Sequence, residues 1–128
     1  MEKAHPRVIG SILHDFYTGV ERIFMRIAEE LGEGLPRGEH WYRELLEDMV
    51  LELEGIRPAV ISKELKRQLD EYLRFRHLFR GIYGFELEIG RLEPLVEGLQ
   101  KVYSRFKAEI NRFCKFLDQL ISGLGITD

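Results

Sequence analysis

The sequence RLEPLVEGLQKVYSRFKAEINRFCKFLDQLISGL, residues 91–124, carries the most regular apolar pattern in the chain. Its apolar residues recur in alternating steps of four and three, the repeat of a helix that packs along one seam. They are Leu92, Val96, Leu99, Tyr103, Phe106, Ile110, Phe113, Leu117, Leu120 and Leu124, with Leu95, Val102 and Ile121 widening the face. Pro94 fits a first turn, and Gly123 suits a helix end. The pattern predicts a bundle helix from about Arg91 to Ser122.

Two more helices are predicted in the first half of the chain. The first covers residues 7–31, with Pro6 in its first turn. Its apolar stripe consists of Ile9, Leu13, Phe16, Val20, Ile23, Ile27 and Leu31. The second covers roughly residues 39–54, because apolar residues recur at helical spacing until Gly55 and Pro58 stop it.

The remaining helix starts after Ser62, a residue type suited to the N-cap, with Glu64 in the favourable first turn. It is expected to end at Gly81 or Gly84. Because no run of alternating residues indicates a strand, we predict an all-α fold. The expected architecture is an antiparallel, up-down four-helix bundle that forms a single domain of residues 1–128.

Three aromatic residues fall outside the main apolar stripes. Tyr17 and Phe24 lie beside the stripe of the first helix, and Phe116 lies beside that of the last. Apolar surface wider than one bundle seam suggests that a second chain covers it. We therefore expect a homodimer.

The composition is that of one folded domain, with 128 residues of which 45% are hydrophobic and 32% charged. The single Cys114 cannot form an intrachain disulfide. No apolar run approaches the roughly 18 residues of a membrane span, and the N-terminus has no signal-peptide pattern. A cytoplasmic protein without a membrane partner is expected.

The net charge of −3 conceals a local imbalance. Residues 63–80 contain six Lys or Arg and three acids, whereas residues 39–54 contain one Arg and six acids. The apolar stripe of the basic helix consists of Leu65, Leu69, Tyr72, Arg76, Phe79 and Tyr83. An arginine within such a stripe must either extend to solvent along its aliphatic stem or meet an anion.

Common catalytic signatures are missing: the chain has no Walker loop, no Cys-x-x-Cys, no His-Glu-x-x-His and no Gly-x-Ser-x-Gly. His40, Glu44 and Asp48 have the spacing at which one helix face could present metal ligands. Charged residues four apart are, however, usual on any solvated helix. We therefore expect no metal site and no cofactor.

The segment Arg76-His77-Leu78-Phe79-Arg80-Gly81-Ile82-Tyr83-Gly84-Phe85-Glu86-Leu87 closely resembles the signature of HepT-like proteins in the HEPN superfamily. Residues 16–24, 40–46 and 94–99 resemble the same family, so the resemblance covers nearly the whole chain. It implies a dimeric four-helix bundle and a metal-independent endoribonuclease. It also implies the toxin role in a toxin–antitoxin pair with a minimal nucleotidyltransferase.

The family motif is Arg, four to six residues, His and then Tyr two residues later. It maps onto Arg76 and Tyr83, but Gly81 occupies the His position. In the family, the His is the acid or base for attack of the RNA 2′-hydroxyl, and the Arg neutralises the phosphorane. The resemblance assigns catalysis to Arg76, and His77 is the substitute base. It makes Tyr83 a substrate contact or the acceptor of AMP from the nucleotidyltransferase.

Each of these residues also has a structural interpretation. Arg76 could pair between helices, for example with an acid of the second helix. His77 could be an exposed helical residue, and Tyr83 a core tyrosine. Arg74 and Arg80 are expected to bind RNA through its phosphates.

Three functions remain open from the sequence. The first is a toxin-type endoribonuclease with preserved or reduced activity. The second is a non-catalytic module that binds RNA or the nucleotidyltransferase, and the third is an unrelated helical bundle. The arginines favour the first two, and Gly81 favours the second over the first.

Overall fold

A computed structural model describes the backbone of residues 6–80 and 89–123 and the side chains of residues 7–76 and 92–123. It contains four helices, α1 (Pro6–Glu30), α2 (Trp41–Asp48), α3 (Lys63–Arg80) and α4 (Ile89–Gly123). The described residues form no strand, only an isolated bridge between Leu53 and Arg57. The predicted all-α bundle of four helices is confirmed.

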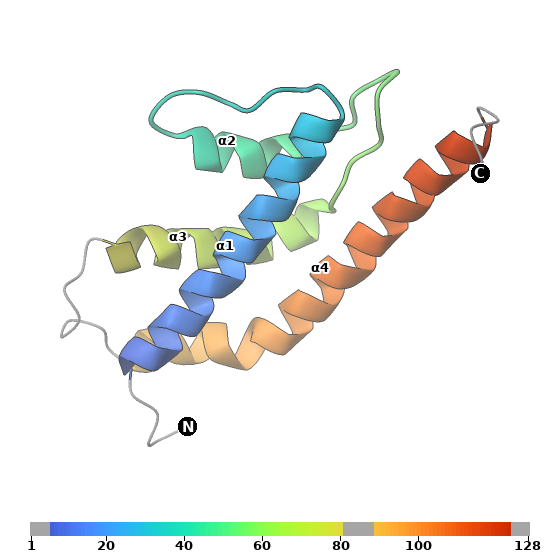
Figure 1. Cartoon of the computed structure of the whole chain (residues 1–128). Helices are drawn as coiled ribbons and strands as arrows, with labels where there is room; N and C mark the ends of the chain where they lie inside the picture. The colour runs from blue at the N-terminus through green and yellow to red at the C-terminus, as the bar shows by residue number, and fades with distance from the viewer. Residues whose placement is uncertain (1–5, 81–88, 124–128) are drawn as a thin grey trace.

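Helices α1, α3 and α4 contact one another and enclose the core, while the short α2 packs on α1 and α3 (Figure 1). The stripe predicted for α3 is buried over the residues whose side chains are described. Its members Leu65, Leu69, Tyr72 and Arg76 are each at most 3% exposed. Phe79 and Tyr83, which continue the predicted stripe, lie outside the residues whose side chains are described. None of the described helices is long and apolar enough to span a membrane.

Helix α1 buries most of its predicted stripe, including Ile9, Leu13 and Val20, but the buried face is rotated toward Tyr17 and Phe24. Tyr17 and Phe24 are 1% and 0% exposed, whereas Ile23 of the predicted stripe is 39% exposed. The buried residues at 13, 17, 20, 24 and 28 also have helical spacing, so periodicity alone could not choose between the two faces. It was therefore wrong to read Tyr17 and Phe24 as surface for a second chain. Val8 and Ile12 are instead exposed on the outer side of α1.

Helix α2 is shorter than predicted, since it ends at Asp48 instead of near residue 54. Beyond this end, the buried guanidinium of Arg57 donates to the carbonyls of Asp48 (3.0 Å), Leu51 (2.8 Å) and Pro58 (3.0 Å) and so holds the chain in a non-helical path. A helix that ends in the interior needs such donors for its last carbonyls. Gly55, with φ of +78°, makes the turn that returns the chain to Arg57.

The start of α3 agrees with the prediction. The backbone N–H of Leu65 donates to Ser62 Oγ over 3.1 Å, which is an N-cap contact. In turn, the backbone N–H and hydroxyl of Ser62 donate to the carboxylate of Glu109 over 2.6 and 2.8 Å. The cap therefore also fixes α3 to α4.

Helix α4 begins at Ile89, slightly before the predicted residue 91, so Pro94 lies in its second turn. Proline has no N–H for the carbonyl four residues earlier, and Figure 1 shows α4 changing direction after its first turns. The hydroxyl of Tyr72 donates to the carbonyl of Leu95 over 2.6 Å at this bend. Tyr72 thereby joins α3 to α4, and its ring packs edge-on against Phe16 of α1.

Replacement of Tyr72 by Phe is predicted to lower the free energy of unfolding by about 1 kcal/mol at pH 8, because the Leu95 carbonyl loses a buried donor. Burial raises the pKa of Tyr72 to about 12. A raised folded-state pKa gives stability that is complete below the unfolded-state pKa of about 10 and is lost as the pH rises toward 12. The advantage of the wild type should therefore shrink between pH 10 and 12 in urea unfolding curves.

The matched control is Tyr103→Phe on α4, because that ring is 49% exposed. It should leave stability unchanged at pH 8. Equal losses in both variants would refute the role assigned to the Tyr72 hydroxyl.

Candidate functional site

Arg76 is buried between α1 and α3 in a two-bond ion pair with Glu21. Its Nη1 and Nη2 donate to the Oε1 and Oε2 atoms of Glu21, each over 2.8 Å. The side chains are 4% and 9% exposed. In this geometry both carboxylate oxygens and both terminal nitrogens have partners, which is the arrangement that makes a buried pair tolerable.

Tyr17 of α1 completes the surroundings of this cation. Its ring centroid lies 5.1 Å from Arg76 Cζ, within the range of a cation–π contact. Burial raises the pKa of the Tyr17 hydroxyl well above its usual range, and Glu21 raises it further, while Arg76 opposes the shift. Tyr17 therefore remains a neutral phenol at physiological pH and supplies a ring face to the cation.

The structural interpretation of Arg76, an interhelical ion pair, is thus what the structure shows, but the acid is Glu21 of α1 and does not come from α2. The sequence did contain a signal. Glu21 lies one turn from Tyr17 and three residues before Phe24, so it shares the face of α1 that is buried. An acid on that face and an arginine in the facing stripe of α3 could have been matched once the face was known.

Arg74 points to solvent. Its side chain is 71% exposed and forms a 3.0 Å ion pair with Asp70, one turn earlier in α3. Such exposed pairs contribute little to stability and are readily exchanged for another anion. Arg74 is therefore accessible from solvent, whereas Arg76 is enclosed, and the RNA-binding assignment of Arg74 stays a prediction.

The rest of the predicted site lies outside what the structure describes. This applies to Gly81 and Tyr83 entirely, and to the side chains of His77 and Arg80. The described part brings together Tyr17, Glu21 and Arg76, a cluster that the sequence prediction did not contain. The catalytic assignments of Arg76 and His77, and the assignments of Tyr83 and Arg80, stay predictions.

A second buried arginine, Arg57, was not singled out from the sequence. Its Nε and Nη2 donate to Glu33 over 2.7 and 3.1 Å, and its side chain is 0% exposed. Together with the carbonyl contacts at the end of α2, these bonds tie the 31–35 loop to the 51–58 loop. Nearby, burial and then Glu44 raise the pKa of Asp48, while Arg57 opposes them. We assign the contacts of Arg57 and the raised pKa of Asp48 to the packing of these loops.

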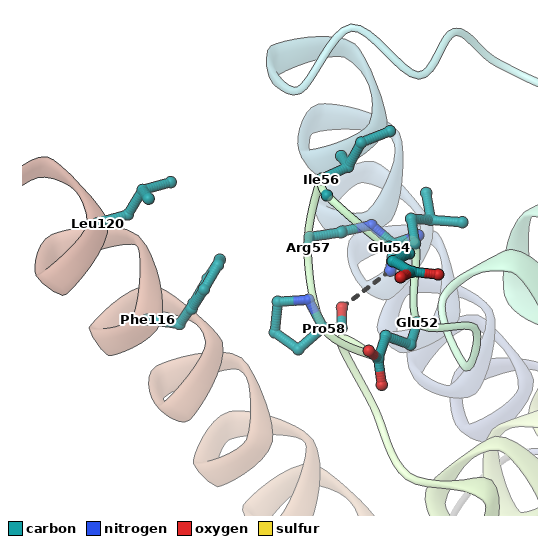
Figure 2. A pocket seen from close by; sticks show the side chains of 9 residues that line it. Glu52, Glu54, Ile56, Arg57, Pro58, Phe116 and Leu120 are labelled. Atoms are coloured by element: carbon teal, nitrogen blue, oxygen red, sulfur yellow. Dashed lines mark hydrogen bonds between the residues drawn. The ribbon is translucent and has the colours of Figure 1, made fainter. Parts of the chain in front are cut away.

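A cleft of about 460 Å³ lies between the 52–58 loop and the last turns of α4. Figure 2 shows Phe116 and Leu120 projecting from α4 toward the loop that carries Ile56 and Pro58. The Arg57 guanidinium extends away from α4 and donates to the Pro58 carbonyl. The cleft is mainly apolar and lies at the C-terminal end of α4, whereas Arg76 lies toward the C-terminal end of α3 (Figure 1).

No group of three or more His, Cys, Asp or Glu within the described ranges is arranged to hold a metal ion. His40 and Glu44, considered as ligands from their spacing, are exposed side chains of α2 and its N-cap. Within the described residues, the polar groups near the predicted site are the guanidinium groups of Arg74 and Arg76 and the neutral phenol of Tyr17, and none of them belongs to a metal-binding cluster.

Comparison with known proteins identifies a family for most of the chain. The model of a family described as HepT-like protein matches residues 8–117. No curated protein and no solved structure gives a significant match. The matched residues include all of α2 and α3, Tyr17 and Glu21 of α1, and most of α4.

The ion pair predicts non-additive effects on stability. Glu21→Met or Arg76→Met alone should lower the free energy of unfolding by about 3–5 kcal/mol, because each leaves the other charge buried and unpaired. The double replacement should recover most of that loss, since two apolar side chains of similar length can pack in the same space. Urea unfolding of the four proteins measures the coupling.

The control is the exposed pair Arg26–Glu30 on α1, with side chains 77% and 68% exposed. Glu30→Met and Arg26→Met should have small and additive effects. Additive losses at Glu21 and Arg76 would contradict the assignment of a structural ion pair.

Proposed function

Because the chain belongs to the HepT-like protein family, we propose that it is an RNA-binding HEPN protein that has lost most or all ribonuclease activity. In this proposal it is the toxin-type component of a toxin–antitoxin pair, with a minimal nucleotidyltransferase as its partner and the cytoplasm as its location. The family supplies the class of function. The surroundings of Arg76 support binding over cleavage.

The observation that carries the proposal is the ion pair of Arg76 with Glu21. A cation that stabilises a phosphorane must reach the phosphate, but Arg76 is 3% exposed and both terminal nitrogens already bind a carboxylate. A phosphate would have to displace Glu21 while that carboxylate stays close by, and the two anions would repel each other. This favours a structural role over direct participation in cleavage.

Gly81 supports the same conclusion from the sequence. General acid–base catalysis needs a titratable group within hydrogen-bond reach of the reacting oxygen, and glycine has none. His77 follows Arg76 directly, so on a helix its Cβ is rotated about 100° from that of Arg76. An imidazole in that direction is poorly placed to act on a phosphate next to Arg76.

The proposed assembly is a homodimer. Val8, Ile12 and Ile23 are 57%, 54% and 39% exposed and lie on one side of α1, next to the face that packs in the core. An exposed apolar stripe of this kind is typical of a surface that meets another helix. A second copy of the chain is the partner that the family resemblance implies.

An active ribonuclease is the second candidate. It is favoured by the fixed position of Arg76, since a cation held in one geometry needs no reorganisation during a reaction. In this alternative Arg76 and His77 are catalytic, and Tyr83 contacts the substrate or accepts AMP.

An RNA cleavage assay in EDTA distinguishes the two candidates. The purified protein is predicted to leave RNA intact, and Arg76→Lys should give the same result. Metal-independent cleavage by the wild type that is lost in Arg76→Lys would overturn the proposal. Requiring this loss separates the protein's own activity from a contaminating nuclease.

A motif-restoring variant tests the same point from the sequence side. Gly81→His restores the family pattern of Arg, four residues and His. Because Arg76 is enclosed by Glu21, we expect this variant to leave RNA intact in EDTA, as the wild type does. Cleavage by the variant would show that only the acid–base group was missing and would contradict the structural role of Arg76. Gly81→Gln is the control, because it adds a polar side chain that cannot titrate.

A further inference from the structure

A basic hollow of about 310 Å³ lies between the end of α2 and the first turns of α3. Lys63, Lys66 and Arg67 of α3 form one side of the hollow. Glu47, Val50 and Leu51, from α2 and the residues after it, form the other. Leu51 is 52% exposed, so the hollow presents an apolar surface beside three cations.

These cations have no ion-pair partner among the described residues. Two of the three acids of α3 are engaged elsewhere, and the third, Glu71, lies one turn after Arg67. Glu64 pairs with Arg105 of α4 over 2.9 Å, and Asp70 pairs with Arg74 over 3.0 Å. Glu47 is the single acid in the lining. The hollow therefore presents an uncompensated positive charge in a chain whose net charge is −3.

The three cations and Arg74 lie on one side of α3, since steps of three, four, seven and eleven residues return to the same face of a helix. Residues 63 and 74 are about 16 Å apart along the helix axis, at ~1.5 Å per residue. Along the axis of a DNA duplex, successive phosphates of one strand advance by roughly 3.4 Å. The row of cations is therefore long enough to contact several consecutive phosphates.

We propose that this hollow, together with Arg74, is the surface on which the protein holds a single strand of RNA. The inference rests on the proposed RNA-binding function and adds the location of the strand. The phosphates contact Lys63, Lys66, Arg67 and Arg74, and one nucleoside lies against Leu51. An acidic protein segment would also match the charge, and the competition experiment below separates it from RNA.

The test is fluorescence anisotropy of a labelled 12-nucleotide single-stranded RNA with the full-length protein in EDTA, over a range of KCl concentrations. The variant Lys63→Ala/Lys66→Ala/Arg67→Ala should weaken binding at least tenfold and lower the slope of log affinity against log salt by about 2, from the loss of three phosphate contacts. The matched control is Lys101→Ala/Arg112→Ala/Lys115→Ala, three exposed cations of α4 with the same change in net charge. It should bind within about twofold of the wild type.

The outcomes separate this inference from the function on which it rests. Wild-type protein that does not bind RNA would overturn both. RNA binding that survives the α3 triple variant, or that falls equally in the α4 control, would overturn the location and leave RNA binding standing. Displacement of the RNA by poly-glutamate as effectively as by unlabelled RNA would assign the surface to an acidic protein partner instead. Circular dichroism of both variants confirms that each is folded.

Discussion

The buried ion pair between Glu21 and Arg76 is the interaction on which the arrangement of α1 and α3 depends. Removing two charges from water is unfavourable by several kcal/mol per ion, and the loss is offset only when geometry and hydrogen bonding are nearly complete. Here the pair is bidentate at 2.8 Å, and the Tyr17 ring faces the guanidinium. A shift of either helix would break both bonds together, so the pair fixes the position of one helix against the other.

Four of the described arginines occupy two kinds of environment. Arg57 and Arg76 are buried, each with a bidentate carboxylate from a distant part of the chain. Arg67 and Arg74 are on the outer side of α3, where solvent or a ligand can reach them. Because both kinds occur along α3, an arginine-rich segment that looks uniformly basic in the sequence serves both the core and the surface.

The difference between enclosed and exposed arginines matters for function, because only the exposed arginines can reach a ligand. The resemblance to HEPN proteins implies a cation and an acid–base group at the same phosphate. Arg76, to which it assigns the cation, is enclosed, and Gly81 occupies the position that it assigns to the acid–base group. The features that remain suited to RNA are the exposed cations along α3. That combination supports the proposal of RNA binding without efficient cleavage. A nucleotidyltransferase partner would then regulate access to RNA and not the rate of a reaction.

Much of the fold could be predicted from helical periodicity and capping. Four helices, the Ser62 cap and the buried stripe through Leu65, Leu69, Tyr72 and Arg76 all follow from local rules. What failed depended on tertiary contacts. Beyond the end of α2, the chain is held by Arg57, which binds carbonyls nine and six residues before it. The buried face of α1 is set by packing against α3, and its own sequence is apolar on more than one side.

For the site, the sequence identified Arg76 as an unusual cation and raised the possibility of an interhelical pair, but it could not name Glu21. Pairing across 55 residues depends on how two helices are rotated, and neither rotation is encoded locally. The basic hollow was missed for a related reason. Lys63, Lys66 and Arg67 were counted as charge on a helix, and only the contact of α2 with α3 forms the hollow that they line.

The central claim is that Arg76 is enclosed by Glu21 while Arg74, two residues away in the same helix, is open to solvent. Chemical modification with phenylglyoxal, followed residue by residue by mass spectrometry, measures this directly. We expect Arg74 to react rapidly and Arg76 to react only as fast as the protein unfolds, with Arg57 as a second protected residue. Reaction of Arg76 at the rate of Arg74 in the folded protein would show that the pair with Glu21 opens freely, and would contradict the structural role of Arg76.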